Sequence, residues 1–230
     1  MGSAVTAAPI VPRRRCLTTT ALLVIVLLAS DPGGEARAQD RPDSASAPRP
    51  RVEDGGQQRG NPDARVLVIE FADFGCGYCA GFAAETHPAL DAEFVRTGLV
   101  RWRVVPVALG LSRNSDDAAA AALCASRQDA FWPMYEQLFA ERSQWLTLRR
   151  PRPRFLAWAR QLGLDAAQFG ACLGDRDIRD SVRQATEAAR KAGVRATPTF
   201  LIQGRRVEGA IPLPLFRKLL VEALDASRAR

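Results

Sequence analysis

Two cysteines separated by two residues, Cys76-Gly77-Tyr78-Cys79, are the part of the sequence best suited to chemistry. Thiols at this spacing can close a small disulfide ring and exchange it with the cysteines of other proteins, provided that one of them forms a stable thiolate. The same spacing also supplies half of a zinc site. The pattern alone therefore leaves a redox centre and a metal centre open.

The segments around the cysteines predict a strand, a helix and a second strand. Residues 66–72 form a nearly continuous apolar run, which is typical of a strand covered on both faces. A helical pattern follows from Cys76 to about Arg96, with a kink expected at Pro88, and a second strand is predicted over residues 99–105. Cys76 thus begins a helix, where unpaired N–H groups and the helix dipole stabilise a thiolate. This context favours the redox centre.

The rest of the chain predicts a helical block followed by more strands. Residues 112–192 carry alanine-rich and amphipathic segments separated by turn signals. A strand is predicted at residues 199–203, a short partner strand at 206–209, and a closing helix after them. The order is βαβ, an all-helical insertion, then ββα. We therefore predict an α/β protein in which residues 60–111 and 193–230 form one domain that the insertion interrupts.

A second candidate element is Thr197-Pro198-Thr199, directly before the predicted third strand. Proline cannot donate a hydrogen bond to a sheet, so Pro198 is expected at the first residue of that strand. A cis bond would make a tight turn there, but the sequence taken alone favours an ordinary trans proline.

The N-terminal residues carry the features of an export signal. Three arginines at 13–15 precede an apolar run over 17–29, and Ala36-Arg37-Ala38 matches a cleavage site, so residues 1–38 are predicted to be a signal peptide. The run is short for a membrane span, although an uncleaved anchor and the twin-arginine route both stay open. Residues 39–59, rich in Pro, Ser, Gly and Arg, are predicted to be a flexible linker.

Composition and charge exclude several classes of protein. With 47% hydrophobic and 25% charged residues, the chain is globular and not disordered. The formal charge of +7 is spread over arginines interleaved with acids, which argues against nucleic-acid binding. Removal of residues 1–38 leaves an even number of cysteines, which fits an oxidising compartment and allows three pairings of Cys76, Cys79, Cys124 and Cys172.

Three further features are given ordinary structural roles. His87, the only histidine, lies about three helical turns from Cys76 and is expected to pack and not to share a metal with it. The arginine-rich run at residues 149–154 could bind an acidic partner, but a solvated loop between helices is the favoured interpretation. Helical spacing typical of a core is shared by Trp132, Tyr135, Leu138 and Phe139.

Several motifs, by their order and spacing, resemble the DsbA-like branch of the thioredoxin superfamily over residues 60–228. They are Gly60 to Ala64, the strand and loop from Glu70 to Phe74, the cysteine pair, Phe131-Trp132, and Gly193 to Phe200. The resemblance implies a thioredoxin fold interrupted by a helical domain, with Cys76 as the attacking cysteine and Cys79 as the resolving one. It also implies a cis Pro198 beside Thr197, in place of the trans proline favoured above.

The resemblance assigns roles to three more residues. Glu70 stands where the family commonly carries an acid beneath the active site. Its pKa is expected to be raised by burial, so that it could relay a proton to Cys79; a solvent-bonded edge residue is the alternative. Cys124 and Cys172 are expected to form a structural disulfide, because relatives carry a cysteine pair at similar places. Two buried free thiols are the alternative there.

The function expected is that of an exported protein thiol–disulfide oxidoreductase whose only redox group is the Cys76–Cys79 disulfide, with no metal or other cofactor. Its expected partners are cysteine-containing exported proteins and a membrane or soluble protein that resets the disulfide, and its expected location is periplasmic or otherwise extracytoplasmic. Net oxidation is favoured over isomerase or reductase activity, although Gly77-Tyr78 supplies no cation and predicts a milder oxidant. A metal-binding module using the four cysteines and a noncatalytic scaffold are the other classes considered.

Overall fold

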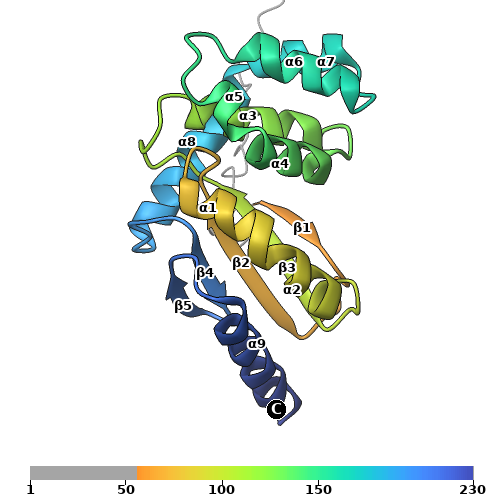
Figure 1. Cartoon of the computed structure of the whole chain (residues 1–230), viewed down its shortest axis with the longest axis vertical. Helices are drawn as coiled ribbons and strands as arrows, with labels where there is room; N and C mark the ends of the chain where they lie inside the picture. The colour runs from red at the N-terminus through yellow and green to blue at the C-terminus, as the bar shows by residue number, and fades with distance from the viewer. Residues whose placement is uncertain (1–55, 230) are drawn as a thin grey trace, which may run out of the picture. The chain divides into compact units, whose positions relative to one another are not determined.

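The structure is a computed structural model that describes residues 56–229, so the predicted signal peptide and most of the predicted linker lie outside it. Its centre is a five-stranded mixed sheet with the order β1-β3-β2-β4-β5 (Figure 1). The strands are β1 (Gln57–Arg59), β2 (Val66–Ala72), β3 (Val100–Pro106), β4 (Thr199–Ile202) and β5 (Arg205–Glu208). The central strand β2 leads directly into the loop before Cys76.

β2 lies in the middle of the sheet because all of its side chains except Glu70 are apolar, on both faces of the strand. All of its residues except Leu67 are buried. It pairs in parallel with β3 and antiparallel with β4, which in turn pairs antiparallel with β5. A parallel neighbour requires a crossover, and the helical segment between β2 and β3 supplies it. This topology confirms the predicted βαβ and ββα order and the thioredoxin fold.

The helix predicted from Cys76 to about Arg96 is wound in four consecutive pieces. They are α1 (Gly77–Gly81), the π-helical segment η2 (Phe82–Thr86), α2 (His87–Leu90) and the π-helical segment η3 (Asp91–Val95). Pro88 stands at the second residue of α2, where a missing N–H is tolerated. The wider π turns on either side of α2 thus accompany the kink expected at Pro88.

Helices cover both faces of the sheet. On one face, α2 and α9 (Leu213–Arg228) pack over an aromatic cluster in which neighbouring ring centroids lie 4.7–6.0 Å apart, formed by Phe82, Trp102, Phe200 and Phe216. On the other face, α8 (Arg176–Lys191) contacts β3 and covers a smaller cluster that includes Ile69, Phe71 and Ala189. β2 is thereby shielded from solvent on both sides.

The helical insertion gathers at the end of the sheet where α1 begins (Figure 1). Its helices are α3 (Ser115–Ser126), α4 (Phe131–Ala140), α5 (Arg142–Trp145), α6 (Arg152–Gln161) and α7 (Ala166–Gly174), after which α8 returns the chain to the sheet. α3 contacts α4, α6, α7 and α8, and its residues Ala118–Ala122 are all buried. Alanine suits this position because short side chains let several helices pack closely against one.

The predicted linker over residues 39–59 is wrong at its end, because Gln57–Arg59 form strand β1. This strand pairs antiparallel with β3, with Gln58 opposite Arg103. A polar segment can form an edge strand because pairing uses backbone groups, which carry no compositional signal. Gly60 then turns the chain with a φ of +95°, and a Cβ there would lie 2.7 Å from the Val100 carbonyl oxygen. None of the helices within residues 56–229 has the length and hydropathy of a membrane span.

Candidate active site

Cys76 occupies the N-cap position of α1. Its backbone is extended, with φ −79° and ψ 126°, and its N–H donates to the Asp73 carbonyl oxygen at 2.9 Å. The loop after β2 therefore turns the chain so that the sulfur faces the start of the helix. A hydrogen bond from the Cys79 thiol lowers the pKa of Cys76 from 9.0 to about 5. Burial opposes this effect, while contacts with the Thr197 side chain and the N–H groups of Cys79 and Tyr78 reinforce it.

Cys79 has the opposite environment. It is fully buried one helical turn further on, and both cysteines are free thiols in this structure. Burial raises the pKa of Cys79, and its hydrogen bond to Cys76 together with the nearby charges of Cys76 and Glu70 raises it further. The pair is therefore asymmetric, with a thiolate at Cys76 above about pH 5 and a protonated thiol at Cys79.

Thr197 and Pro198 lie against the reactive sulfur. The Thr197–Pro198 peptide bond is cis, and Pro198 is buried. The Sγ atom of Cys76 lies 3.2 Å from the Thr197 carbonyl oxygen, although 121 residues separate the two. The Thr197 side chain is buried beside the same sulfur and helps to lower the pKa of Cys76.

Glu70 is a buried carboxyl in the middle of β2, with no exposed surface. Its Oε2 accepts a hydrogen bond from Trp102 Nε1 at 2.9 Å, and its Oε1 accepts one from the Tyr135 hydroxyl at 3.4 Å. Burial raises the pKa of Glu70 to about 7 despite these two donors. A group that titrates near neutrality, with its charge coupled to Cys79, is suited to give and take a proton there.

Sequence reasoning missed two residues that hold the loop between β2 and α1. Asp73 is fully buried; its Oδ1 accepts from the Gly75 N–H at 2.8 Å and its Oδ2 from the Leu109 N–H at 3.1 Å. Burial raises the pKa of Asp73 above its ordinary value. Arg142 of α5 donates to the Gly75 carbonyl oxygen from Nε at 3.0 Å and from Nη2 at 2.6 Å. The helical insertion thus holds Gly75, the residue directly before Cys76, through two hydrogen bonds.

The surface beside the cysteines is open and partly apolar. Tyr78, between the two cysteines, is 75% exposed, and Leu111, in the loop before α3, is 60% exposed. That loop touches the active site, since a Cβ on Gly75 would lie 2.4 Å from the Cβ of Ser112. Cys76 itself is only 5% exposed. A partner sulfur therefore has only a small part of the Cys76 surface to approach.

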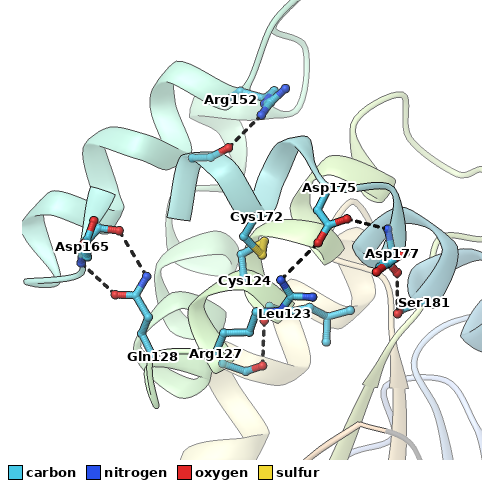
Figure 2. Close-up of a disulfide and its surroundings, with 12 residues drawn as sticks. Leu123, Cys124, Arg127, Gln128, Arg152, Asp165, Cys172, Asp175, Asp177 and Ser181 are labelled. Atoms are coloured by element: carbon cyan, nitrogen blue, oxygen red, sulfur yellow. Dashed lines mark hydrogen bonds and ion pairs between the residues drawn. A yellow bond between two sulfur atoms is a disulfide. The ribbon is translucent and has the colours of Figure 1, made fainter. Parts of the chain in front are cut away.

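Cys124 and Cys172 are joined by a disulfide that links α3 to α7, with a Cα–Cα distance of 5.8 Å and a sequence separation of 48 (Figure 2). The Arg127–Asp175 ion pair at 3.4 Å lies beside it. Of the three pairings that the sequence allowed, the structure therefore has the one that leaves Cys76 and Cys79 together.

His87 takes no part in a ligand set. It is 5% exposed, stacks on Trp132 with ring centroids 6.1 Å apart, and lies edge-on to Trp102 at 5.2 Å. Burial lowers the pKa of His87 to about 4. Within residues 56–229, no three His, Cys, Asp or Glu side chains gather as metal ligands would.

Comparison with known proteins places this geometry in a family. The family model described as "Thioredoxin" matches residues 53–222. The crystal structure of alpha-DsbA1 from Wolbachia pipientis has a TM-score of 0.67 at 21% identity, with 76% of this chain and 94% of that chain covered. A Bacillus anthracis protein named "Probable disulfide bond formation protein D" is 27% identical over 161 residues. The match covers 64% of this chain and 70% of that protein.

Antiporters are also among the similar proteins. Na(+)/H(+) antiporter NhaA 3 of Salinispora tropica is 33% identical over 174 residues, which are 75% of this chain. The chain spans only about a quarter of that antiporter, because the match covers 25% of its length. The similarity thus concerns one part of a longer protein.

Proposed function

The chain belongs to the thioredoxin family, and on that premise we propose that it is an exported, DsbA-like protein thiol–disulfide oxidoreductase that introduces disulfides into other proteins. The observation that carries the proposal is the asymmetry of the cysteine pair. Cys76 begins a helix as a thiolate that is 5% exposed, while Cys79, one helical turn further on, is a fully buried thiol. Disulfide exchange needs one sulfur that attacks and leaves readily and a second, protected sulfur that resolves the mixed disulfide.

In the first step a substrate thiolate attacks Sγ of Cys76 in the Cys76–Cys79 disulfide. The bond between the two cysteines breaks, a mixed disulfide forms at Cys76, and the electron pair leaves on Cys79. Because its surroundings strongly favour the neutral thiol, the Cys79 sulfur takes up a proton. Glu70, with a pKa raised by burial to about 7, is our proposed donor of that proton.

In the second step another substrate thiolate attacks the substrate sulfur of the mixed disulfide. The substrate leaves as a disulfide and Cys76 departs as a thiolate, which is a good leaving group because its pKa is about 5. The substrate loses two electrons and the cysteine pair gains them. A second protein, membrane-bound or soluble, then has to reoxidise the pair.

The low pKa of Cys76 also supports the oxidising direction. A stabilised thiolate makes the reduced protein more stable and the disulfide a stronger oxidant. Disulfide isomerase or reductase activity is the alternative, since Gly77-Tyr78 provides no cation beside the sulfur. A metal site built from all four cysteines finds no support, because Cys124 and Cys172 are already bonded to each other.

The test is a trapping experiment with residues 39–230. A Cys79→Ala variant should accumulate mixed disulfides with cysteine-containing proteins of the exporting cell, because the resolving sulfur is missing. The matched Cys76→Ser variant should trap none. The intact protein should also oxidise a reduced, unfolded protein such as ribonuclease A. Equal trapping by both variants, or no oxidation by the intact protein, would contradict the proposed function.

A further inference from the structure

A basic groove of about 1020 Å³ lies between α8, the first turn of α3 and the segment that joins α5 to α6. Seven arginines and three carboxylates line it, a net charge of +4. Three of the arginines, Arg179, Arg183 and Arg190, come from one face of α8, and the others are Arg113, Arg149, Arg150 and Arg152. The groove is far more basic than the chain as a whole.

Most of this charge is not neutralised within the protein. Across residues 56–229, Arg113, Arg149, Arg150 and Arg179 make no ion pair or side-chain hydrogen bond, and all four are exposed. The lining carboxylates Asp116, Asp117 and Glu187 stand in the same groove without pairing to the arginines. Unpaired guanidinium groups in a concavity attract anions, because each can bind a carboxylate or phosphate through two N–H groups.

The spacing of the arginines sets the size of the anion. Arg179 and Arg190 are eleven residues apart on α8, a rise of about 16 Å at 1.5 Å per residue. An extended polypeptide covers that length with about five residues. One phosphate ion cannot span it. Nucleic acid is disfavoured as well, because no aromatic side chain lines the groove to stack on a base.

We propose that this groove binds an acidic polypeptide segment of the proteins whose cysteines the active site oxidises. The inference rests on the proposed function, which makes polypeptides the substrates. It also assigns a function to residues 149–153 of the arginine-rich run. The solvated loop expected over residues 149–154 is wrong at its end, because α6 begins at Arg152. The carboxylates Asp116, Asp117 and Glu187 would contact N–H groups or basic residues of the same segment.

The groove is linked to the active-site loop by a chain of three hydrogen bonds. Arg190 donates to the Leu109 carbonyl oxygen at 3.1 Å, and the Leu109 N–H donates to Oδ2 of Asp73 at 3.1 Å. Asp73 in turn accepts from the N–H of Cys76 through its carbonyl oxygen. An acidic segment in the groove therefore lies next to the loop that carries the reactive cysteine, and should favour substrates with acidic residues near their own cysteines.

Binding is tested first with a fluorescent peptide of about ten residues that carries glutamate at alternate positions and no cysteine, and with the same peptide carrying glutamine. At low ionic strength the glutamate peptide should bind about tenfold more tightly, and the difference should shrink as salt is added. The R150E/R179E variant should lose the difference. The matched R160E/K218E variant makes the same charge change on exposed residues outside the groove and should keep it within about twofold.

Three results would overturn the proposal: equal binding of the two peptides, equal loss in both variants, or displacement of the peptide by inorganic phosphate at an ionic strength where chloride has no effect. The last would mean a site for single anions. Oxidation rates separate this proposal from the proposed function. With dithiol versions of the two peptides, the ratio of kcat/KM should be about ten for the intact protein and about one for R150E/R179E. If neither peptide is oxidised, the proposed function fails while the binding result stands.

Discussion

Replacing Glu70 by glutamine should change how the stability of the protein depends on pH. Burial raises the pKa of Glu70 from 4.5 to about 7, so the folded state holds a proton on this group that the unfolded state gives up. Its contribution to stability is fully present below the unfolded value of 4.5 and is lost as the pH rises through about 7. The interval between the two values corresponds to about 3 kcal/mol, and a glutamine, which does not titrate, has no such contribution to lose.

His87 acts in the opposite direction over almost the same interval. Burial lowers its pKa from 6.5 to about 4, so between these pH values His87 is protonated in the unfolded state and neutral in the folded state. The stability that His87 contributes is present above 6.5 and is lost as the pH falls through about 4. The two buried groups should therefore nearly cancel in the native protein between pH 4.5 and 6.5. Relative to the native protein, the Glu70→Gln variant should therefore gain about 3 kcal/mol of stability across that interval, because every other titrating group, Asp73 included, is common to both.

The assay is urea unfolding of the oxidised protein at a series of pH values from about 4 to 8, a range that brackets both groups. Oxidation removes Cys76 and Cys79 as titrating groups. In the Glu70→Gln variant the new amide oxygen can still accept from Trp102, but the amide nitrogen cannot accept from the Tyr135 hydroxyl. That loss is the same at every pH and drops out of the slope. A free-energy difference between native and variant protein that stays constant from pH 4.5 to 7 would refute the reasoning.

Three other outcomes follow from the site. The rate of alkylation of the reduced protein by iodoacetamide should show an inflection near pH 5 from Cys76 alone; an inflection near the free value of about 8.5, or labelling of Cys79, would contradict it. Titration against glutathione should give a reduction potential of about −210 mV. The Cys76 pKa of about 5 lies about two units below that of the reactive cysteine of thioredoxin, and each pKa unit raises the potential by about 30 mV from the thioredoxin value of about −270 mV. A measured value near −270 mV would favour the reductase alternative. Changing Cys124 and Cys172 to serine should lower the free energy of unfolding by about 4 kcal/mol, because the disulfide closes a loop over a sequence separation of 48. The reactivity of Cys76 should not change. A loss of stability below about 1 kcal/mol would count against a structural role for this disulfide.

Features that depend on neighbours in sequence were predictable. An apolar run followed by two cysteines at a helix start was enough to predict β2 and a thiolate at Cys76. The order of the elements along the chain, βαβ and then ββα, followed from the alternation of strand and helix patterns. The helix after Cys76 was predicted with the right span but without its π turns, since periodicity over so few residues does not separate α from π winding.

Contacts made across long stretches of chain were not predictable. Arg142 reaches Gly75 across 67 residues, and Tyr135, which the sequence identified only as a core residue, reaches Glu70 across 65. Both depend on how the helical insertion docks on the thioredoxin domain, and no local pattern reports docking. The same holds for β1, which is a strand only because the edge of β3 lies beside it.

The two outer strands of the sheet have a consequence for a protein that would work among unfolded chains. One edge is closed by the three polar residues of β1, and the other by β5, where Arg205, Arg206 and Glu208 are exposed. A long apolar edge would offer its free N–H and carbonyl groups as a template on which unfolded substrates could add as extra strands and aggregate. Short, charged edges discourage that. If the protein oxidises unfolded polypeptides as proposed, these edges would keep its substrates from adding to the sheet as extra strands.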